Sequence, residues 1–600
     1  MTADAAAPEV ADEREDQAPA GESPSRRRHV VVRTLVALLV ALVLAGGWLT
    51  YQVYRAGTAL TAAQGKVTAL RASVEDGDLS AVMDALPALR ADLGRARSAS
   101  SDPVWTAALV VPWLGDQLGA VRTVSVALDD VVEAGQPLLS AVDQALTTSP
   151  DDSGGIDLAP LVAAVPELVA AAGDVSRSSG AVLALDTGTL MDRLAVPIEE
   201  LSGRLPPLRD ALAAAARTAA VLPTMLGTDG TRTYLVALLN SAELRTQGGI
   251  VGAIAVLHAD DARIALGAQV AGSGFPGLER SVLELTDDEL ALQTDRLGRY
   301  VQDATLTPEF PRAAQLLAAR WTHETGEEVD GVIALDSTVV AGMLRGTGPV
   351  TAAGERLDAD SAVRVLLSDT YARLSDPEAT DVFFADVAAS VFGAVAAGQG
   401  DRVRVTAELA RAADAGRLRV WSAHEREEAV LADERIGGAF LTGPFEDTVG
   451  VFLDEGTASK LDYYLHTKVG VEDVACTAGR GTATVRLDLR YDPPGDGTGL
   501  PAYVLSGARD GLPLGWLQTN ISFYAPAGAP MNQIRLGDAW VGGETGETAG
   551  RAVHRVTARM APGDELTYRV EVPVRDGELG VWSTPTLTSP GWLTAACTTG

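Results

Sequence analysis

The sequence is poor in cysteine, aromatic residues and positive charge. Among 600 residues there are two cysteines, aromatic residues make up 5%, and 48 lysines and arginines stand against 80 acidic residues. The resulting formal net charge of −32 at pH 7 would repel nucleic-acid phosphates. We therefore expect no nucleic-acid partner.

Familiar catalytic signatures are also missing. The sequence holds no Walker-type phosphate loop, no GxSxG elbow and no HExxH pair, the patterns that mark many phosphate-binding, hydrolytic and zinc-dependent sites. Its six histidines, at positions 29, 258, 323, 424, 466 and 554, are widely scattered. Hydrolase and metalloprotease functions are thus disfavoured, whereas a carboxylate pair acting on sugars stays open.

The N-terminus combines a polar tail with a long apolar run. Residues 1–33 begin with a stretch rich in Ala, Pro, Glu and Asp, which predicts a disordered cytoplasmic tail. Residues 34–54 (TLVALLVALVLAGGWLTYQVY) carry no charge, and this length suffices for a helix to cross roughly 30 Å of hydrocarbon. We expect a single-pass transmembrane helix acting as a signal-anchor. A cleaved signal peptide ending near Ala45 is the alternative.

The distribution of arginines predicts the orientation of this helix. One arginine, Arg55, follows the apolar run, and four precede it, namely Arg26, Arg27, Arg28 and Arg33. Positive residues favour the cytoplasmic side, so the bulk of the chain is expected to be extracytoplasmic. Cys476 and Cys597 then fit one disulfide formed in an oxidising exterior, and a catalytic thiol is the less favoured interpretation.

Beyond the membrane segment, the pattern predicts a multidomain α+β protein. Residues 56–226 show apolar residues at helical spacing, as in VTALRASVEDGDLSAVMDALPALRADLGRA, which is typical of a helical stalk or bundle. Residues 228–465 alternate short strand-like runs with helical stretches and predict a mixed α/β domain with a helical extension. Residues 470–600 are dominated by period-two segments and predict a β-sandwich-like domain.

One loop carries the candidate site. Residues 240–252 read NSAELRTQGGIVG and join two predicted strands, 233–239 and 250–257. Arg245 offers a planar fork of donors suited to phosphate or carboxylate, and Gly248 with Gly249 would let backbone amides approach an anion. Polar neighbours could orient the arginine or bind sugar hydroxyls; these are Asn240, Glu243 and Gln247. Alternatively, Glu243 pairs locally with Arg245, or Arg245 caps a helix while the glycines only make a tight turn.

These residues carry a resemblance. NSAELRTQGGIVG is similar to the hallmark Asn-Asn-x-Glu-Leu-Arg-Pro-x-Gly-Gly-Phe-Ile-Gly of a bacterial domain-of-unknown-function family, numbered 4012, of membrane-anchored extracytoplasmic proteins. Ser241, Thr246 and Ile250 depart from it. The segments DATLTPEFPRAAQLL (303–317), VDGVIALDSTVVAGMLRGTGPV (329–350) and ASKLDYYL (458–465) are similar to further parts of that family.

The order of strand, Arg-bearing loop and strand also resembles the LytR-CpsA-Psr family, whose members transfer glycopolymers from polyprenyl pyrophosphate carriers to the cell wall. This resemblance implies a LytR-CpsA-Psr-like α/β domain in which Arg245 binds the lipid pyrophosphate. It further implies a Mg²⁺ ion as a candidate cofactor, with Asp303 and Asp336 as its candidate ligands.

Three functions follow as hypotheses. The first is a cell-envelope protein that binds, and as a candidate phosphotransferase transfers, an anionic glycopolymer or polyprenyl-phosphate-linked precursor. The second is a non-catalytic structural or assembly protein of the envelope with protein partners there. The third, a glycosidase, rests only on the abundance of carboxylates.

Overall fold

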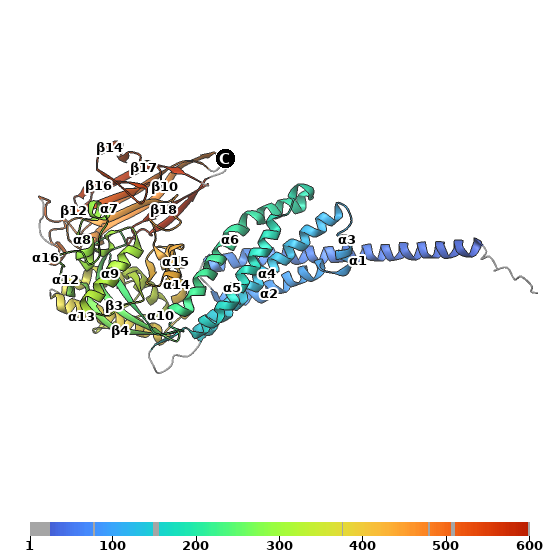
Figure 1. Ribbon diagram of the computed structural model, residues 1–600, viewed down its shortest axis with the longest axis horizontal. Helices are drawn as coiled ribbons and strands as arrows, with labels where there is room; N and C mark the ends of the chain where they lie inside the picture. The colour runs from blue at the N-terminus through green and yellow to red at the C-terminus, as the bar shows by residue number, and fades with distance from the viewer. Residues whose placement is uncertain are drawn as a thin grey trace, which may run out of the picture. The chain divides into compact units, whose positions relative to one another are not determined.

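The computed structural model (Figure 1) describes residues 24–75, 79–147, 155–374, 376–477, 480–505, 511–575 and 577–597. Most of the predicted disordered tail, residues 1–23, lies outside these ranges. Helix α1 spans Pro24–Glu75, so the last ten residues of the predicted tail are helical. Proline suits a first helical position and arginine is a good helix former, which explains the early start.

The α1 helix is apolar enough to span a membrane. Its segment Val31–Leu70 has a mean hydropathy of 2.1 in its most apolar stretch, none of which is buried inside the protein. Ala159–Leu183 and Glu378–Ala396 also reach the required length and composition, but a third of each is buried. In the last of these, Phe383 and Val387 belong to a hydrophobic core cluster, so protein packing accounts for its apolar face.

The predicted helical region consists of helices separated where Pro, Gly, Ser and Asp cluster. Residues 98–103, 111–115 and 149–155 are rich in these residue types or contain Pro and Gly close together, which predicts breaks there. The first range contains the junction of α2 and α3, and the second overlaps the junction of α3 and α4. The third predicted break, 149–155, falls mainly outside the described residues. The helices after α1 are α2 Leu79–Ser100, α3 Pro103–Ala108, α4 Leu114–Thr147, α5 Ala159–Leu183 and α6 Asp192–Met225.

The chain divides into two compact units. The first contains residues 1–69, 85–129 and 180–203; the second contains 70–84, 130–179 and 204–600. In the first unit, Trp105 is fully buried among Ala56, Ala99 and Leu118. The border between the units passes through helices, so it differs from the predicted border between the helical region and the α/β domain.

A mixed six-stranded sheet lies in the second unit, in the order β1-β4-β3-β2-β5-β8. β2 and β5 are parallel and all other neighbours are antiparallel. The strands are β1 Ile156–Asp157, β2 Arg232–Asn240, β3 Ile250–Asp260, β4 Arg263–Ala271, β5 Gly331–Asp336 and β8 Leu418–Ser422. Alternate residues of β2, Leu235, Ala237 and Leu239, pack in one core cluster with Phe310 of α9.

Helices form further layers around this sheet. The α9 helix packs on β5, and α10 contacts β2, β5, α13 and α14. These helices are α9 Phe310–Thr325, α10 Ser337–Thr347, α13 Pro377–Ala396 and α14 Arg402–Asp414. Shorter elements are α7 Asp287–Gln293, α8 Arg296–Arg299, β6 Val350–Ala352, β7 Glu355–Leu357, α11 Ala362–Arg364, α12 Thr370–Arg373, α15 Glu425–Ala432 and α16 Ala502–Leu505.

The C-terminal part contains two sheets that share one apolar core, including Val451, Val485 and Ile521. Their orders are β10-β11-β17-β13-β14 and β15-β16-β12-β9-β18-β19. The strands are β9 Val449–Glu455, β10 Leu465–Thr477, β11 Arg480–Tyr491, β12 Leu517–Tyr524, β13 Ile534–Leu536, β14 Ala539–Val541, β15 Glu544–Thr548, β16 Arg551–Met560, β17 Glu565–Val574, β18 Glu578–Ser583 and β19 Trp592–Ala596.

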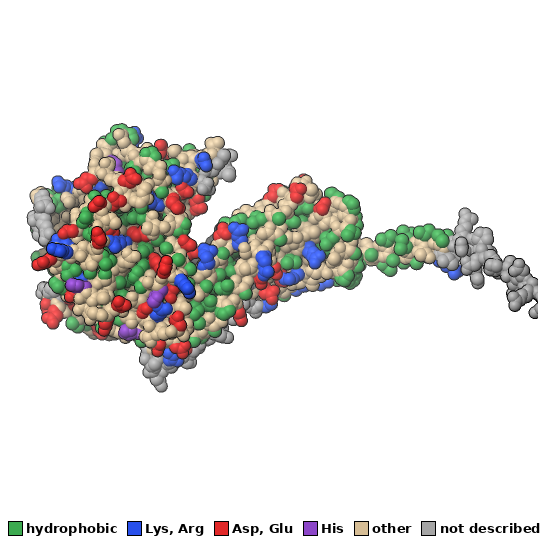
Figure 2. Space-filling view, viewed as in Figure 1, with side chains coloured by type: hydrophobic (Ala, Val, Ile, Leu, Met, Phe, Trp, Pro, Cys, Tyr) green, Lys and Arg blue, Asp and Glu red, His purple; other side chains and the backbone are tan. Residues whose placement is uncertain are grey.

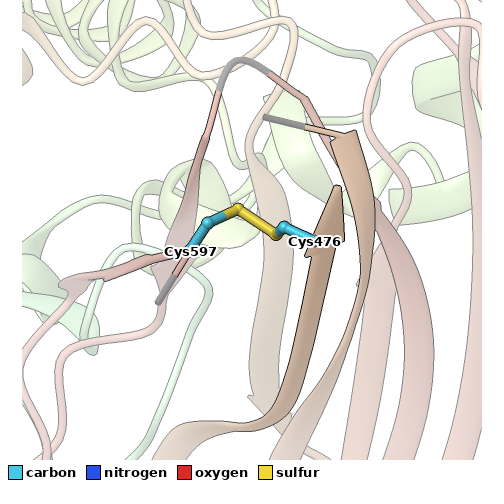
Figure 3. Close-up of a disulfide and its surroundings, with 2 residues drawn as sticks. All are labelled: Cys476 and Cys597. Atoms are coloured by element: carbon cyan, nitrogen blue, oxygen red, sulfur yellow. A yellow bond between two sulfur atoms is a disulfide. The ribbon is translucent and has the colours of Figure 1, made fainter. Parts of the chain in front are cut away.

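Two features of this region bear on the sequence predictions. Cys476 and Cys597 form the expected disulfide, with Cα atoms 5.8 Å apart (Figure 3). Strand β9, however, belongs to a sandwich sheet although residue 449 lies inside the predicted α/β domain. It pairs with β12 and β18, because its uniformly buried side chains require covering on both faces.

Candidate functional site

The candidate loop, residues 241–249, connects β2 to β3 and has a fixed conformation. The side-chain oxygen of Asn240 accepts a hydrogen bond from the Ala242 amide at 3.0 Å, and its Nδ2 donates to the Tyr371 hydroxyl at 2.7 Å. Gly249 has a φ of 159°, and a Cβ there would lie 2.4 Å from the Asn240 carbonyl oxygen. The asparagine and the glycine are thus needed for the turn itself.

Arg245 lies at the centre of this loop with its guanidinium turned toward carboxylates. Its Nε and Nη2 donate to Asp303 Oδ1 at 3.1 and 3.0 Å. Its Nη1 donates to the Leu244 carbonyl at 2.9 Å and lies 3.9 Å from Glu455 Oε2. The side chain is 11% exposed. The donors predicted for a phosphate are therefore engaged by the protein's own acids.

Asp303, predicted as a magnesium ligand, bridges two arginines. Its Oδ2 lies 2.7 Å from Nη2 of Arg296, whose side chain is 57% exposed, whereas the Asp303 side chain is 2% exposed. Asp303 thus links the buried guanidinium of Arg245 to one at the surface.

The second predicted magnesium ligand, Asp336, has different partners. Its Oδ1 caps α10 by accepting from the amides of Thr338 and Val339 at 2.8 and 3.1 Å. Its Oδ2 accepts from Arg417 Nη1 at 2.6 Å. Within the described ranges, no group of three or more His, Cys, Asp or Glu residues could hold a metal ion. Each of the two aspartates is paired with arginine.

The loop also joins the α/β sheet to the β-sandwich. The Thr246 amide and hydroxyl donate to Asp454 Oδ1 at 2.8 and 3.0 Å, and the Glu455 amide donates to the Leu244 carbonyl at 2.9 Å. The Leu244 amide donates to Asp462 Oδ2 at 2.8 Å. We call residues 241–249 together with Asp303, Asp454, Glu455 and Asp462 the seam.

Glu243 and Gln247 complete the seam. Glu243 forms an ion pair with Lys460, whose ammonium lies 4.7 Å from the ring centre of Tyr371 and 4.8 Å from that of Tyr503. The Nε2 of Gln247 donates to the Thr307 carbonyl at 2.7 Å. The alternative pairing of Glu243 with Arg245 is replaced by one with Lys460, although the charge of Glu243 still acts on the arginine.

Burial among these charges shifts several pKa values. Burial alone would lower the pKa of Arg245, but the charges of Asp303 and Glu455 outweigh this and raise it. Burial raises the pKa of Asp454 to about 6, against the opposing effects of Arg245 and Thr246. Burial, reinforced by the charge of Glu455, raises the pKa of Asp462 well above its ordinary value. The seam thus places several buried acids around one guanidinium.

Burial likewise raises the pKa of Glu455, although the Thr457 hydroxyl and Arg245 oppose the shift. Glu455 accepts hydrogen bonds from the amides of Ala458 and Ser459 at 2.6 and 3.2 Å. These bonds fix the turn that follows β9 and present Asp462 to the loop.

Several of these residues were outside the sequence prediction. Asp454 and Glu455 end a strand and carry no local pattern that pairs them with a loop some 200 residues earlier. Lys460 and Asp462 had a signal, because they lie in ASKLDYYL (458–465), one of the segments that resembled the family.

Comparisons with known proteins give one match. No curated protein and no solved structure matches the chain, so the similarity to the LytR-CpsA-Psr family stays a prediction. A family model matches the chain from just before β2 to within α12. This region includes the loop, Arg245, Asp303 and Asp336, whereas Asp454, Glu455 and Asp462 lie beyond it. Residues 229–371 match the model of the family described as "Protein of unknown function (DUF4012)".

Proposed function

We propose that this is a membrane-anchored cell-envelope protein with a non-catalytic structural or assembly function, in which the seam joins the α/β sheet to the sandwich. The observation that carries the proposal is the state of Arg245. Its side chain is 11% exposed and bound to Asp303, with Glu455 beside it. A guanidinium held in this way supports neighbouring elements and has no free edge for an incoming anion.

The location is part of the proposal. The apolar segment of α1 anchors the chain in the membrane, with the arginine-rich N-terminus in the cytoplasm and the bulk outside. The protein partners would then be other components of the envelope. The disulfide supports this location, since disulfides persist in oxidising compartments.

The competing proposal is binding, and transfer, of an anionic glycopolymer or polyprenyl-phosphate-linked precursor at Arg245. Its support is the membrane helix, which would keep the site near lipid-linked substrates. A phosphate would have to displace Asp303 and lie among Glu243, Asp454 and Glu455, whose charges act on Arg245. Like charges at this spacing oppose such binding.

The two proposals are distinguished by calorimetric titration of the detergent-solubilised full chain with a short polyprenyl pyrophosphate, with and without Mg²⁺. The matched variants are Arg245→Lys and Arg296→Lys, since both arginines pair with Asp303 and only Arg245 is buried. We expect no saturable heat from any of the three proteins. Saturable binding to the wild type that is lost in Arg245→Lys and kept in Arg296→Lys would establish the competing proposal.

A further inference from the structure

The turn between α3 and α4 exposes an unusual amount of apolar surface. Val110 is 84% exposed, Val111 44% and Trp113 60%. Leu109 and Leu114, on either side, are partly buried against the core of the first unit. We call residues 109–113 the apolar turn. Three adjacent apolar side chains directed to solvent mark an interaction surface.

The conformation of the apolar turn is fixed by its own backbone. Trp113 has a φ of 64°, a left-handed conformation that costs energy for a bulky side chain. The Gly115 amide donates to the Val111 carbonyl at 2.7 Å, and a Cβ on Gly115 would lie 2.1 Å from the Leu109 carbonyl oxygen. The fold therefore keeps the Trp113 backbone in an energetically unfavourable conformation while its indole is exposed.

The apolar turn lies against α1 within the same unit. Asp102, which caps α3 by accepting from the Val104 amide at 2.8 Å, also accepts from Trp48 Nε1 and Gln52 Nε2, each at 3.1 Å. Leu49 packs in the same cluster as Leu109. Figure 1 shows α3 beside α1 where α1 emerges from the other helices of its unit, and Figure 2 shows hydrophobic side chains at that end.

The position along α1 matches the surface of a membrane. The uncharged run begins at Thr34, directly after Arg33, and at 1.5 Å per residue a hydrocarbon core of roughly 30 Å ends about 20 residues later, near Tyr54. Trp48 and Tyr51 are the aromatic residues that prefer the interface. Since Leu49 contacts the cluster that contains Leu109, the apolar turn lies at the same depth.

We propose that the apolar turn inserts into the head-group region of the bilayer that α1 spans. The occupant of this surface is lipid, because the surface continues the one that α1 already presents to the membrane. Asp116 follows in the first turn of α4 and limits the insertion to the interface, where charge is tolerated. The helical unit is thereby held at a fixed height and tilt on the membrane. This inference rests on the proposed membrane anchoring.

A second turn adds to the same end of the unit. The Gln117 side chain, one turn into α4, accepts from the Met191 amide at 2.9 Å and donates to the Thr189 carbonyl at 3.0 Å. Met191 itself is 41% exposed. The turn between α5 and α6 is thus tied to the start of α4 and adds apolar surface next to it.

The experiment is site-directed spin labelling of the full chain in lipid vesicles. The sequence has two cysteines and both form the disulfide, so one introduced cysteine is labelled uniquely. Val110→Cys tests the apolar turn. Val67→Cys, 53% exposed on α1, is the matched control, and Leu42→Cys, 62% exposed, tests the membrane helix itself. The readout is collision with apolar oxygen relative to a water-soluble nickel chelate.

The expected oxygen-to-nickel ratio at Val110→Cys is several-fold above that at Val67→Cys and below that at Leu42→Cys. A ratio at Val110→Cys equal to that at Val67→Cys, with Leu42→Cys still in lipid, would overturn the inference and leave the anchor intact. A water-exposed Leu42→Cys would overturn the anchor. Dipolar broadening at Val110→Cys would show that a second copy covers the turn, and would also overturn the inference.

Discussion

Arg245 is a cation whose burial is compensated by Asp303 and Glu455, and this pairing predicts the effect of removing it. Arg245→Ala removes the arginine beside Glu455 and leaves the buried Asp303 with only the exposed Arg296 as its ion-pair partner, which costs about 3–5 kcal/mol of unfolding free energy. The measurement is urea unfolding followed by tryptophan fluorescence. Arg177→Ala, which breaks the exposed pair with Asp174, is the control and should change little.

The double variant Arg245→Ala/Asp303→Ala should recover part of that loss, because it also removes the buried Asp303 carboxylate, which Arg245→Ala leaves with only the exposed Arg296 as its ion-pair partner. An Arg245→Ala protein with the unfolding midpoint of the wild type would mean that solvent, not the carboxylates, stabilises the guanidinium.

The raised pKa of Asp454 predicts that the free energy of unfolding depends on pH. Its folded pKa of about 6 lies above the roughly 3.9 of an unfolded aspartate. Its contribution to stability is therefore complete below about pH 4 and is lost as the pH rises through 6. Between pH 4.5 and 7.5 the wild type should lose about 2 kcal/mol that Asp454→Asn does not lose.

Urea unfolding at both pH values measures this difference. Asparagine keeps an oxygen that accepts from the amide and hydroxyl of Thr246, so the fold is expected to persist. Equal pH dependence in the two proteins would show that Asp454 titrates at its ordinary pKa in the folded state.

At this residue scale, the sequence located the loop but could not predict its partners. The glycines and Asn240 follow turn chemistry, which is local. Asp454 contacts the loop because the sandwich packs against it, and nothing in the local pattern around Asp454 encodes a contact 208 positions away. An exposed arginine that binds phosphate and a buried arginine that pairs with the protein's own acids have the same local sequence pattern.

At the scale of elements, strong periodicity predicted the structure well. The buried run GVIALD (331–336) and the alternating run ELTYRVEVPV (565–574) predict strands and coincide with β5 and β17, and the helical spacing of residues 311–324 predicts a helix and falls within α9. Strand β8 was missed because Leu418–Ser422 is short and directly precedes a helix. Strand β9 joins a C-terminal sheet although residues 449–455 fall within the range 228–465 predicted as the α/β domain, because burial on both faces does not identify the sheet that a strand joins.

The disulfide gives a prediction at the element scale. It links β10 of one sheet to the residue after β19 of the other and closes a separation of 121 residues. Cross-links that close loops of this size restrict the unfolded chain, and their loss costs about 3–5 kcal/mol. Cys476→Ser/Cys597→Ser should therefore unfold at lower urea and exchange amide hydrogens faster in β19.

Wild-type protein treated with a reductant should reproduce the behaviour of the double serine variant. If the variant keeps the wild-type midpoint while the strands still form, the apolar core shared by the two sheets suffices to hold β19, and the covalent link is dispensable for stability.

At the scale of the whole molecule, the sequence predicted the secondary-structure class of each region better than the boundaries between regions. The multidomain α+β organisation with an apolar N-terminal helix and a strand-rich C-terminal region is confirmed. Residues 70–84, 130–179 and 204–226, predicted as parts of a separate helical region, cluster with the C-terminal part. Helical periodicity defines which face of a helix is buried, but it does not identify the partner that buries it.

The orientation in the membrane is the last prediction. In spheroplasts of cells that make the full chain, Val382→Cys, 64% exposed, should react with a membrane-impermeant maleimide. Ala5→Cys should react only after permeabilisation, because the arginines before α1 hold the N-terminus inside. The disulfide leaves no other thiol. Labelling in the reverse pattern would contradict the orientation, and protection of Val382→Cys would mean that α13 enters the membrane. A chain from which Ala5→Cys is missing even after permeabilisation would identify α1 as a cleaved signal peptide and remove the anchor.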